Sequence, residues 1–76
     1  MSIKNKINFL MKEQGKSRFD IAESLKISEA AVSNKFYRDS FSAEDLIKIA
    51  DCLDFNLAFI NENQKTIFDL NDIERR

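Results

Sequence analysis

Four short side chains that could contact the edges of nucleic-acid bases lie close together in the chain: Glu29, Ala30, Ser33 and Asn34. Spacings of three and four residues place them on one face of an α-helix. The amide of Asn34 suits adenine, the carboxylate of Glu29 can accept from the N4 amine of cytosine, and the methyl group of Ala30 can touch that of thymine. Glu29 has a second interpretation, because a carboxylate at the start of a helix also favours the helix dipole and repels phosphate.

Basic and hydroxyl side chains around this face could hold the phosphates of a nucleic-acid backbone. Such contacts fix the position of a protein on DNA without reading its sequence. The alternative is a solvated surface, which is the usual situation of single Lys and Arg residues, and the amphipathic Tyr37 suits either interpretation. The candidates are Ser17, Arg18, Ser28, Lys35, Tyr37, Arg38 and Ser40.

The composition argues against catalysis and metal binding. The chain has no His and a single Cys, Cys52, so the usual zinc sites and the Ser-His or Cys-His nucleophile systems are excluded. Neighbouring carboxylates such as Glu44 and Asp45 could do acid–base chemistry, but a solvated helix face explains them better. We therefore expect no enzyme, no cofactor and no metal. A lone cysteine fits a small, semi-buried residue in a reducing cytoplasm.

The charges divide unevenly along a chain whose net charge is −1. Residues 1–41 carry eight basic and five acidic side chains, whereas residues 42–76 carry four and eight. This polarity indicates that the N-terminal part faces an anion. Seventy-six residues with seven Phe suit one domain with one core. The apolar segments are too short and too often interrupted by charges to span a membrane.

Apolar residues at helical spacing predict four helices between residues 2 and 53. Gly15 is expected to end the first helix, and Ser28 to cap the third. Capping-box pairs predict where the second and fourth helices begin, namely Ser17 with Asp20 and Ser42 with Asp45. The expected inward positions are Ile3, Ile7, Leu10, Met11, Ile21, Ala22, Leu25, Ala31 or Val32, Phe36, Leu46, Ile49, Ala50 and Leu53, and five Phe residues, Phe9, Phe19, Phe36, Phe41 and Phe55, are expected in the core.

The spacing changes to that of β-strands after residue 54. The segments FNLAFI (55–60) and KTIFDL (65–70) flank the turn NENQ and predict a β-hairpin. One face is expected to cover the first and fourth helices with Phe55, Leu57, Phe59, Phe68 and Leu70. The other face, with Ala58, Ile60 and Ile67, is expected to pair with a second subunit. The alternative is a hairpin that only caps its own core.

The second and third helices share a joint of three residues, Lys26-Ile27-Ser28. So short a turn forces a steep crossing, which is typical of a helix-turn-helix. Ala22 is small enough for the close approach of the two helices. Ile27 supplies an apolar plug in the turn, and Val32 anchors the third helix.

The segment GKSRFDIAESLKISEAAVSNKFYRDSFSAEDLIKIADCLDF resembles the DNA-binding domain of Cro and lambda-repressor-like regulators, the XRE family. The resemblance covers roughly residues 3–57 and is best to the phage and mobile-element branch, whose third helix ends in a Val-Ser-x-Lys-apolar pattern, here residues 32–36. It implies a near-five-helix fold, operator binding as a dimer, and the third helix in the major groove.

The chain departs from the family pattern at four places. Arg18 stands where the family usually has a Gln that meets a phosphate. Lys26 replaces a Gly that the family usually has in the left-handed conformation, at a cost of about 1 kcal/mol if that geometry is kept. Tyr37-Arg38-Asp39 replaces Glu-Arg-Gly, and the hairpin replaces the fifth helix.

The resulting prediction is a mainly α fold: a four-helix lambda-repressor-like helix-turn-helix domain (1–54) with a C-terminal β-hairpin and tail (55–76) in the same compact domain. The predicted function is a sequence-specific regulator of transcription, a repressor that binds a palindromic operator in double-stranded DNA as a homodimer. The alternative is a protein-interaction module on the same fold, either antitoxin-like or a phage or host defence factor. The predicted location is the cytoplasm of a bacterial or phage-infected cell.

Overall fold

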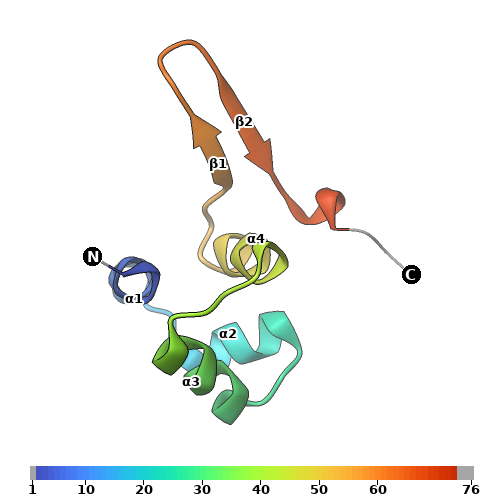
Figure 1. The fold of residues 1–76 in the computed structure, drawn as a ribbon. Helices are drawn as coiled ribbons and strands as arrows, with labels where there is room; N and C mark the ends of the chain where they lie inside the picture. Colours follow the sequence, from blue (N-terminus) through green and yellow to red (C-terminus); the bar gives the residue numbers. More distant parts are fainter. Residues whose placement is uncertain (1, 74–76) are drawn as a thin grey trace.

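The computed structural model describes residues 2–73, which form four α-helices, an antiparallel β-hairpin and a short 3₁₀ turn (Figure 1). This confirms the predicted mainly α fold with a C-terminal hairpin. Within the described residues, no helix is long and apolar enough to cross a membrane. The elements are α1 (Ile3–Gln14), α2 (Arg18–Leu25), α3 (Glu29–Arg38), α4 (Ala43–Cys52), β1 (Leu57–Ile60), β2 (Lys65–Phe68) and η1 (Leu70–Asp72).

The helices begin and end where the local signals predict. The backbone N–H of Ser17 donates to Asp20 Oδ2 at 2.8 Å, and Ser42 forms the equivalent capping box in α4. Ser28 Oγ accepts from the first turn of α3 at 3.1 Å. Gly15 ends α1 with φ 66°, in the left-handed region that suits glycine. These contacts are all local, which explains why the sequence predicts them.

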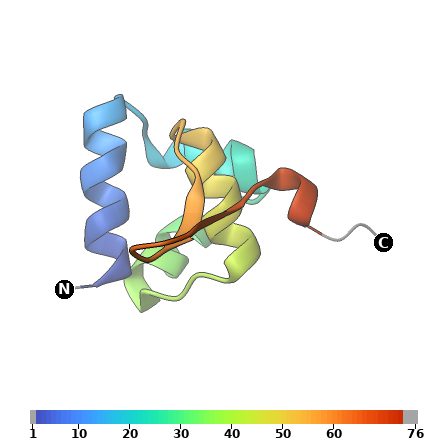
Figure 2. The ribbon, with the colours of Figure 1, turned by 90° about the horizontal axis from the view of Figure 1, so that it is seen from above.

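The core lies where the four helices meet, with α1 along one side of the other three (Figure 2). Val32, rather than Ala31, is the fully buried anchor of α3. Ala22 is buried in α2, which packs against both α3 and α4. The buried residues of the core cluster are Ile7, Met11, Ile21, Ala22, Leu25, Val32, Phe36, Ile49 and Leu53. Ile47 of α4 is also buried, outside the predicted stripe of that helix.

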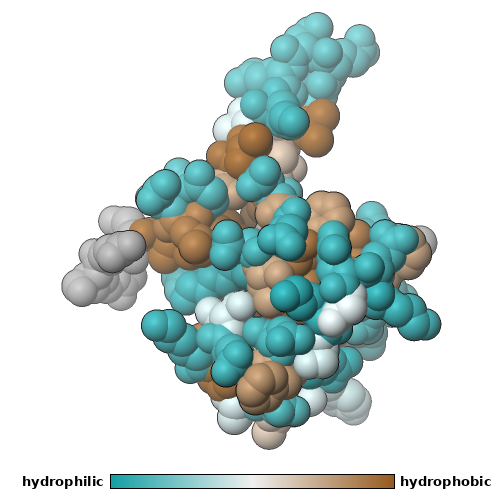
Figure 3. Space-filling view, turned by 180° about the vertical axis from the view of Figure 1, so that it is seen from behind, coloured by the Kyte–Doolittle hydropathy of each residue, from teal (hydrophilic) through white to brown (hydrophobic). Residues whose placement is uncertain are grey.

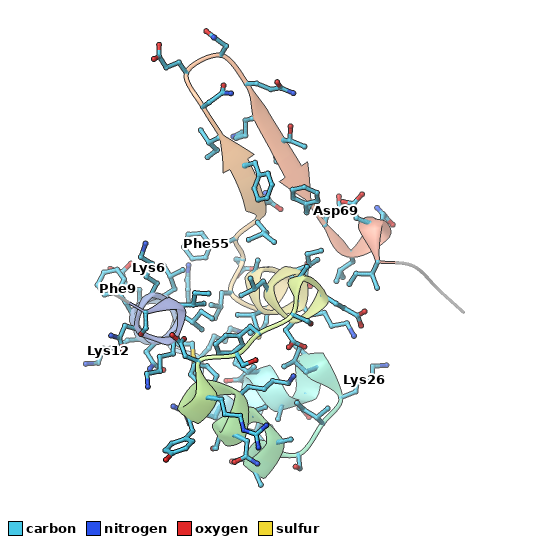
Figure 4. The ribbon with its side chains drawn as sticks, in the orientation of Figure 1. Lys6, Phe9, Lys12, Lys26, Phe55 and Asp69 are labelled. Carbon is cyan, nitrogen blue, oxygen red and sulfur yellow. The ribbon has the colours of Figure 1, made fainter. Side chains whose placement is uncertain are left out.

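Three of the five Phe residues expected in the core are exposed. Phe36 is buried and Phe41 packs edge-on against it, with ring centroids 5.2 Å apart. Phe9 is 60% exposed, because it lies on the side of α1 opposite to the buried stripe. Phe19 is 53% exposed and Phe55 is exposed as well. Figure 4 shows Phe9 directed away from the other helices. Composition alone counted these rings as core. Phe9 and Phe19 lie on exposed sides of α1 and α2, and Phe55 lies in the connection between α4 and β1.

Among residues 2–73, three residues other than glycine have positive φ: Lys26 (58°), Asp39 (53°) and Asp54 (63°). Lys26 ends α2 in the left-handed conformation, so the turn between α2 and α3 keeps the geometry that the family has with Gly. Asp39 ends α3 in the same conformation, in the position where the resembled family has Gly. Each of these residues carries a strain that glycine would not.

The hairpin rises from the helices and points away from them (Figure 1). Its register pairs Leu57 with Phe68 and Ala58 with Ile67, so the predicted division into two faces is confirmed. The prediction was wrong for Phe55, which precedes the start of β1 at Leu57, and for Leu70, which lies in η1 because an Asp69 capping box turns the chain after β2.

The face expected to cover α1 and α4 covers α4 only in part. An apolar hollow of about 420 Å³ separates the hairpin from α4, and Phe59 is 73% exposed although its ring lies 5.3 Å from that of Phe68. The hollow is lined by Ala43, Leu46, Ile47, Leu57, Phe59 and Phe68. Figure 3 shows hydrophobic residues on the lower part of the hairpin and hydrophilic ones at its tip.

Candidate DNA-binding surface

The outward face of α3 carries the four predicted base-contacting residues. Val32 and Phe36 are buried on the opposite side and fix the rotation of the helix about its axis. This rotation leaves the four candidates together on the surface, and each of them is exposed: Glu29, Ala30, Ser33 and Asn34. The structure therefore brings together the set that the helical spacing predicts.

Arg18 links the first turn of α2 to this face. One guanidinium nitrogen donates to Ser33 Oγ at 3.3 Å, and Cζ lies 4.1 Å from the centre of the Phe36 ring. A cation over an aromatic face is attracted to the negative potential of the ring. The two contacts hold the Arg18 charge beside the polar side chains of α3.

The other predicted phosphate contacts differ in whether their side chains are exposed or already engaged in contacts within the protein. Tyr37 is 84% exposed, and Arg38 and Ser40 are exposed too. Ser17 and Ser28 already make capping contacts: Ser17 Oγ donates to Asp20 at 3.2 Å, and Ser28 Oγ accepts from the backbone of α3. The hydrogen bond from the backbone N–H of Ser17 lowers the pKa of Asp20, and the Ser17 hydroxyl acts in the same direction.

Lys35 is held by an acidic neighbour. Its Nζ lies 2.9 Å from Asp45 Oδ2 at the start of α4. Burial alone would raise the pKa of Asp45, but the hydrogen bonds from Lys35 and from the backbone of Ser42 outweigh it and lower the pKa below its ordinary value. The positive charge of Lys35 is therefore largely compensated inside the protein.

A hollow of about 500 Å³ lies between α1 and α3 and adds residues that the sequence analysis did not single out. We call it the α1–α3 hollow. Lys4 and Asn8 of α1 line it, one helical turn apart. Recognising them from the sequence requires the knowledge that the start of α1 packs beside the end of α3. The complete lining is Lys4, Asn8, Arg18, Ser33, Asn34, Phe36 and Tyr37.

Residues 6–68 match the sequence model of a family described as the bacteriophage CI repressor helix-turn-helix domain. The chain belongs to this family. The match confirms the resemblance to Cro and lambda-repressor-like regulators and makes the chain a DNA-binding regulator. The searches of curated proteins and of solved structures gave no significant match.

The CI repressor match spans the helix-turn-helix, α4 and both strands of the hairpin, because it ends at the last residue of β2. The family is one of DNA-binding repressor domains rather than of enzymes. In this CI repressor domain the predicted dimer residues share one hairpin face: Ala58 pairs with Ile67, and Ile60, two residues along β1, is 71% exposed.

Proposed function

We propose that this CI repressor domain is a sequence-specific repressor of transcription that binds double-stranded DNA through α3 in the major groove. The proposal rests on the exposed polar face of α3, whose orientation is fixed by the buried Val32 and Phe36. An α-helix fits the major groove, where each base pair presents a distinct pattern of donors and acceptors.

The four exposed residues of this face have different proposed roles. Asn34 donates to and accepts from adenine, Ala30 packs on a thymine methyl group, and Ser33 bonds to either partner of a base pair. Glu29 lies in the first turn of α3 and accepts from the N4 amine of cytosine. Ser33 also accepts from Arg18, so base reading and backbone binding are coupled through one hydroxyl.

The proposed phosphate contacts surround this face. The strongest proposed phosphate contacts are Arg18, Arg38 and Tyr37. Among the described residues no carboxylate pairs with either arginine, and the Tyr37 hydroxyl is exposed and has no partner. Lys35 is a weaker member, since Asp45 compensates its charge and takes one of its donors. The hydroxyl members are Ser17, Ser28 and Ser40.

The proposed assembly is a homodimer joined through the hairpin. A two-stranded hairpin is marginally stable in water and leaves unpaired strand edges. The exposed Ile60 and Ile67, together with Ala58 directly opposite Ile67, support pairing with the same face of a second copy. A two-fold dimer would set two recognition helices about 34 Å apart and bind a palindromic operator.

A gel shift with DNA from the promoter region of the protein's own gene tests the DNA-binding proposal. We expect a retarded complex that resists competition by unrelated duplex DNA. The affinity should fall steeply between about 50 and 200 mM salt, because phosphate contacts release counterions. Equal competition by promoter and unrelated DNA would leave only non-specific binding.

The alternative function, a protein-interaction module, is favoured by one observation. The described surface exposes large apolar residues away from α3, among them Phe9 on α1 and Phe59 on the hairpin, and exposed apolar surface often marks a protein contact. The same gel shift separates the two functions, because the protein-interaction module requires no retarded DNA complex.

A further inference from the structure

We propose that the α1–α3 hollow is a binding seat for a DNA backbone phosphate, with Lys4 and Asn8 of α1 as contact residues opposite Arg18. The proposal rests on the proposed DNA binding and extends it to α1. It concerns residues outside the helix-turn-helix itself, and it assigns the hollow to one sugar–phosphate unit of the strand beside α3.

The chemistry of the lining matches a phosphate. Two of its side chains are cations, Lys4 and Arg18, and four are neutral hydrogen-bonding groups: Asn8, Ser33, Asn34 and Tyr37. No carboxylate is among the lining residues, although acidic side chains outnumber basic ones in the chain as a whole. A phosphate oxygen only accepts hydrogen bonds and carries negative charge, so each of these polar groups can donate to it.

The fold holds the Arg18 side chain and the stretch of backbone that carries Lys4. The Lys4 backbone N–H donates to Asp39 Oδ1 at 2.7 Å, which joins the first turn of α1 to the end of α3. Figure 2 shows these two helix ends beside each other. On the other side of the hollow, Ser33 and the Phe36 ring hold Arg18. A guanidinium that is already held loses little conformational freedom when an anion binds, and Lys4 lines the same opening from α1.

The hollow also lies where a DNA strand would pass. Asn34 and Ser33 belong both to its lining and to the base-contacting face of α3. A phosphate in the hollow would therefore adjoin the bases that α3 reads. By contrast, Lys35 on another side of α3 is paired with Asp45, so the free positive charge of this surface is shifted toward α1.

Two other lysines of α1 provide matched controls. Figure 4 shows Lys6 and Lys12 projecting from α1 away from α3, and neither lines the hollow. Lys4→Gln and Lys6→Gln remove the same charge from the same helix. A difference between the two variants therefore reports the location of the charge, because the change in net charge is equal.

The test measures binding of the full chain to a fluorescent duplex of arbitrary sequence, as a function of salt. We expect Lys4→Gln to reduce the slope of log affinity against log salt by about one. If the variant and wild type bind equally at about 1 M salt, the variant then binds roughly eight-fold more weakly than wild type at about 0.1 M salt. Lys6→Gln should leave the slope unchanged, and Lys4→Arg, which keeps the positive charge, should show the wild-type slope. Asn8→Asp, which places a carboxylate in the hollow, should weaken binding to every sequence.

The outcomes distinguish a failure of the phosphate seat in the α1–α3 hollow from a failure of the proposed DNA binding on which it rests. Equal slopes for Lys4→Gln and wild type, with wild-type DNA binding intact, would overturn the seat alone, as would equal losses in Lys4→Gln and Lys6→Gln. A wild-type protein that binds no duplex would overturn both proposals. Circular dichroism melting of each variant distinguishes a loss of DNA binding from a loss of folding.

Discussion

The backbone N–H of Lys4 donates a 2.7 Å hydrogen bond to the carboxylate of Asp39, across 35 residues of chain. Asp39 makes this contact from a left-handed conformation, with φ 53°. Glycine would adopt that conformation without strain, but glycine has no side chain to accept the bond. The strain at Asp39 is therefore offset by a contact that joins α1 to α3.

We expect Asp39→Gly to lower the melting temperature despite the relief of strain. A hydrogen bond to a charged group contributes about 1.5–3 kcal/mol, more than the roughly 1 kcal/mol of strain. A net loss of about 1 kcal/mol lowers the melting temperature of so small a domain by roughly 4–8 °C. Thermal melting by circular dichroism measures it. Asp39→Asn, which tolerates the left-handed region and keeps an acceptor, is the control and should lose less.

Lys26→Gly should have the opposite effect. Lys26 has φ 58° and ψ 44° at the end of α2, and its side chain makes no hydrogen bond or ion pair among the described residues. Relief of about 1 kcal/mol of strain exceeds the roughly 0.4–1 kcal/mol of added entropy of the unfolded chain by up to about 0.6 kcal/mol, which raises the melting temperature by up to about 5 °C. Lys26→Ala retains the strain and should leave the melting temperature near that of wild type. A Lys26→Gly protein that melts earlier than the alanine variant would contradict this account.

The sequence predicted those parts of the fold that depend on neighbouring residues. Ser17, Ser42 and Gly15 act on the turn of helix next to them, so their residue types fixed the helix boundaries before any packing was known. The rotation of α3 was predictable for a related reason, because the alternation of Val32 and Phe36 with polar residues is a property of one helix.

The parts that depend on contacts distant in the chain were not predictable in this way. The count of Phe residues did not say that Phe9 would lie outside the core, since that depends on which side of α1 meets α4 and α2. Nothing local marks Lys4 as a neighbour of Asp39, or Lys35 as the partner of Asp45. The candidate site was thus predicted on α3 and missed on α1.

Acid should destabilise the protein partly through Asp45. Its pKa is lowered in the folded state, so its contribution is complete above the ordinary carboxyl pKa of about 4 and is lost as the pH falls through the lower folded value. We expect Asp45→Asn to be less stable than wild type at pH 7 by up to about 1 kcal/mol, with the difference disappearing at the acid end. Urea unfolding between pH 7 and pH 2 measures this. A difference that stays constant with pH would exclude the ion pair with Lys35 as its cause.

Base reading and phosphate binding predict different results for two exposed residues of α3. Asn34→Ala should weaken binding to the operator by roughly 1–3 kcal/mol and relax the preference at one base pair. Arg38→Ala should weaken binding to every sequence alike and reduce the salt slope by about one. Titrations of operator and random duplexes by fluorescence anisotropy distinguish the two. If both variants behave alike on both duplexes, α3 is not the element that reads the sequence.

Charges on one face of the hairpin should separate the proposed dimer. In the register of the hairpin, Ile60 lies opposite Lys65, so Ile60→Glu forms a cross-strand pair of opposite charge and preserves the hairpin. Combined with Ile67→Lys, it places two charged side chains on the face proposed to meet the second subunit, where their desolvation would cost several kcal/mol. We expect sedimentation equilibrium to show monomers. Operator affinity should also fall, because each monomer would bind its half-site separately.

The matched control is the double variant Phe59→Lys with Thr66→Glu, which introduces two opposite charges directly across the register on the other face. It should remain dimeric, and dissociation of this control instead of the Ile60 and Ile67 variant would move the interface to the face that adjoins α4.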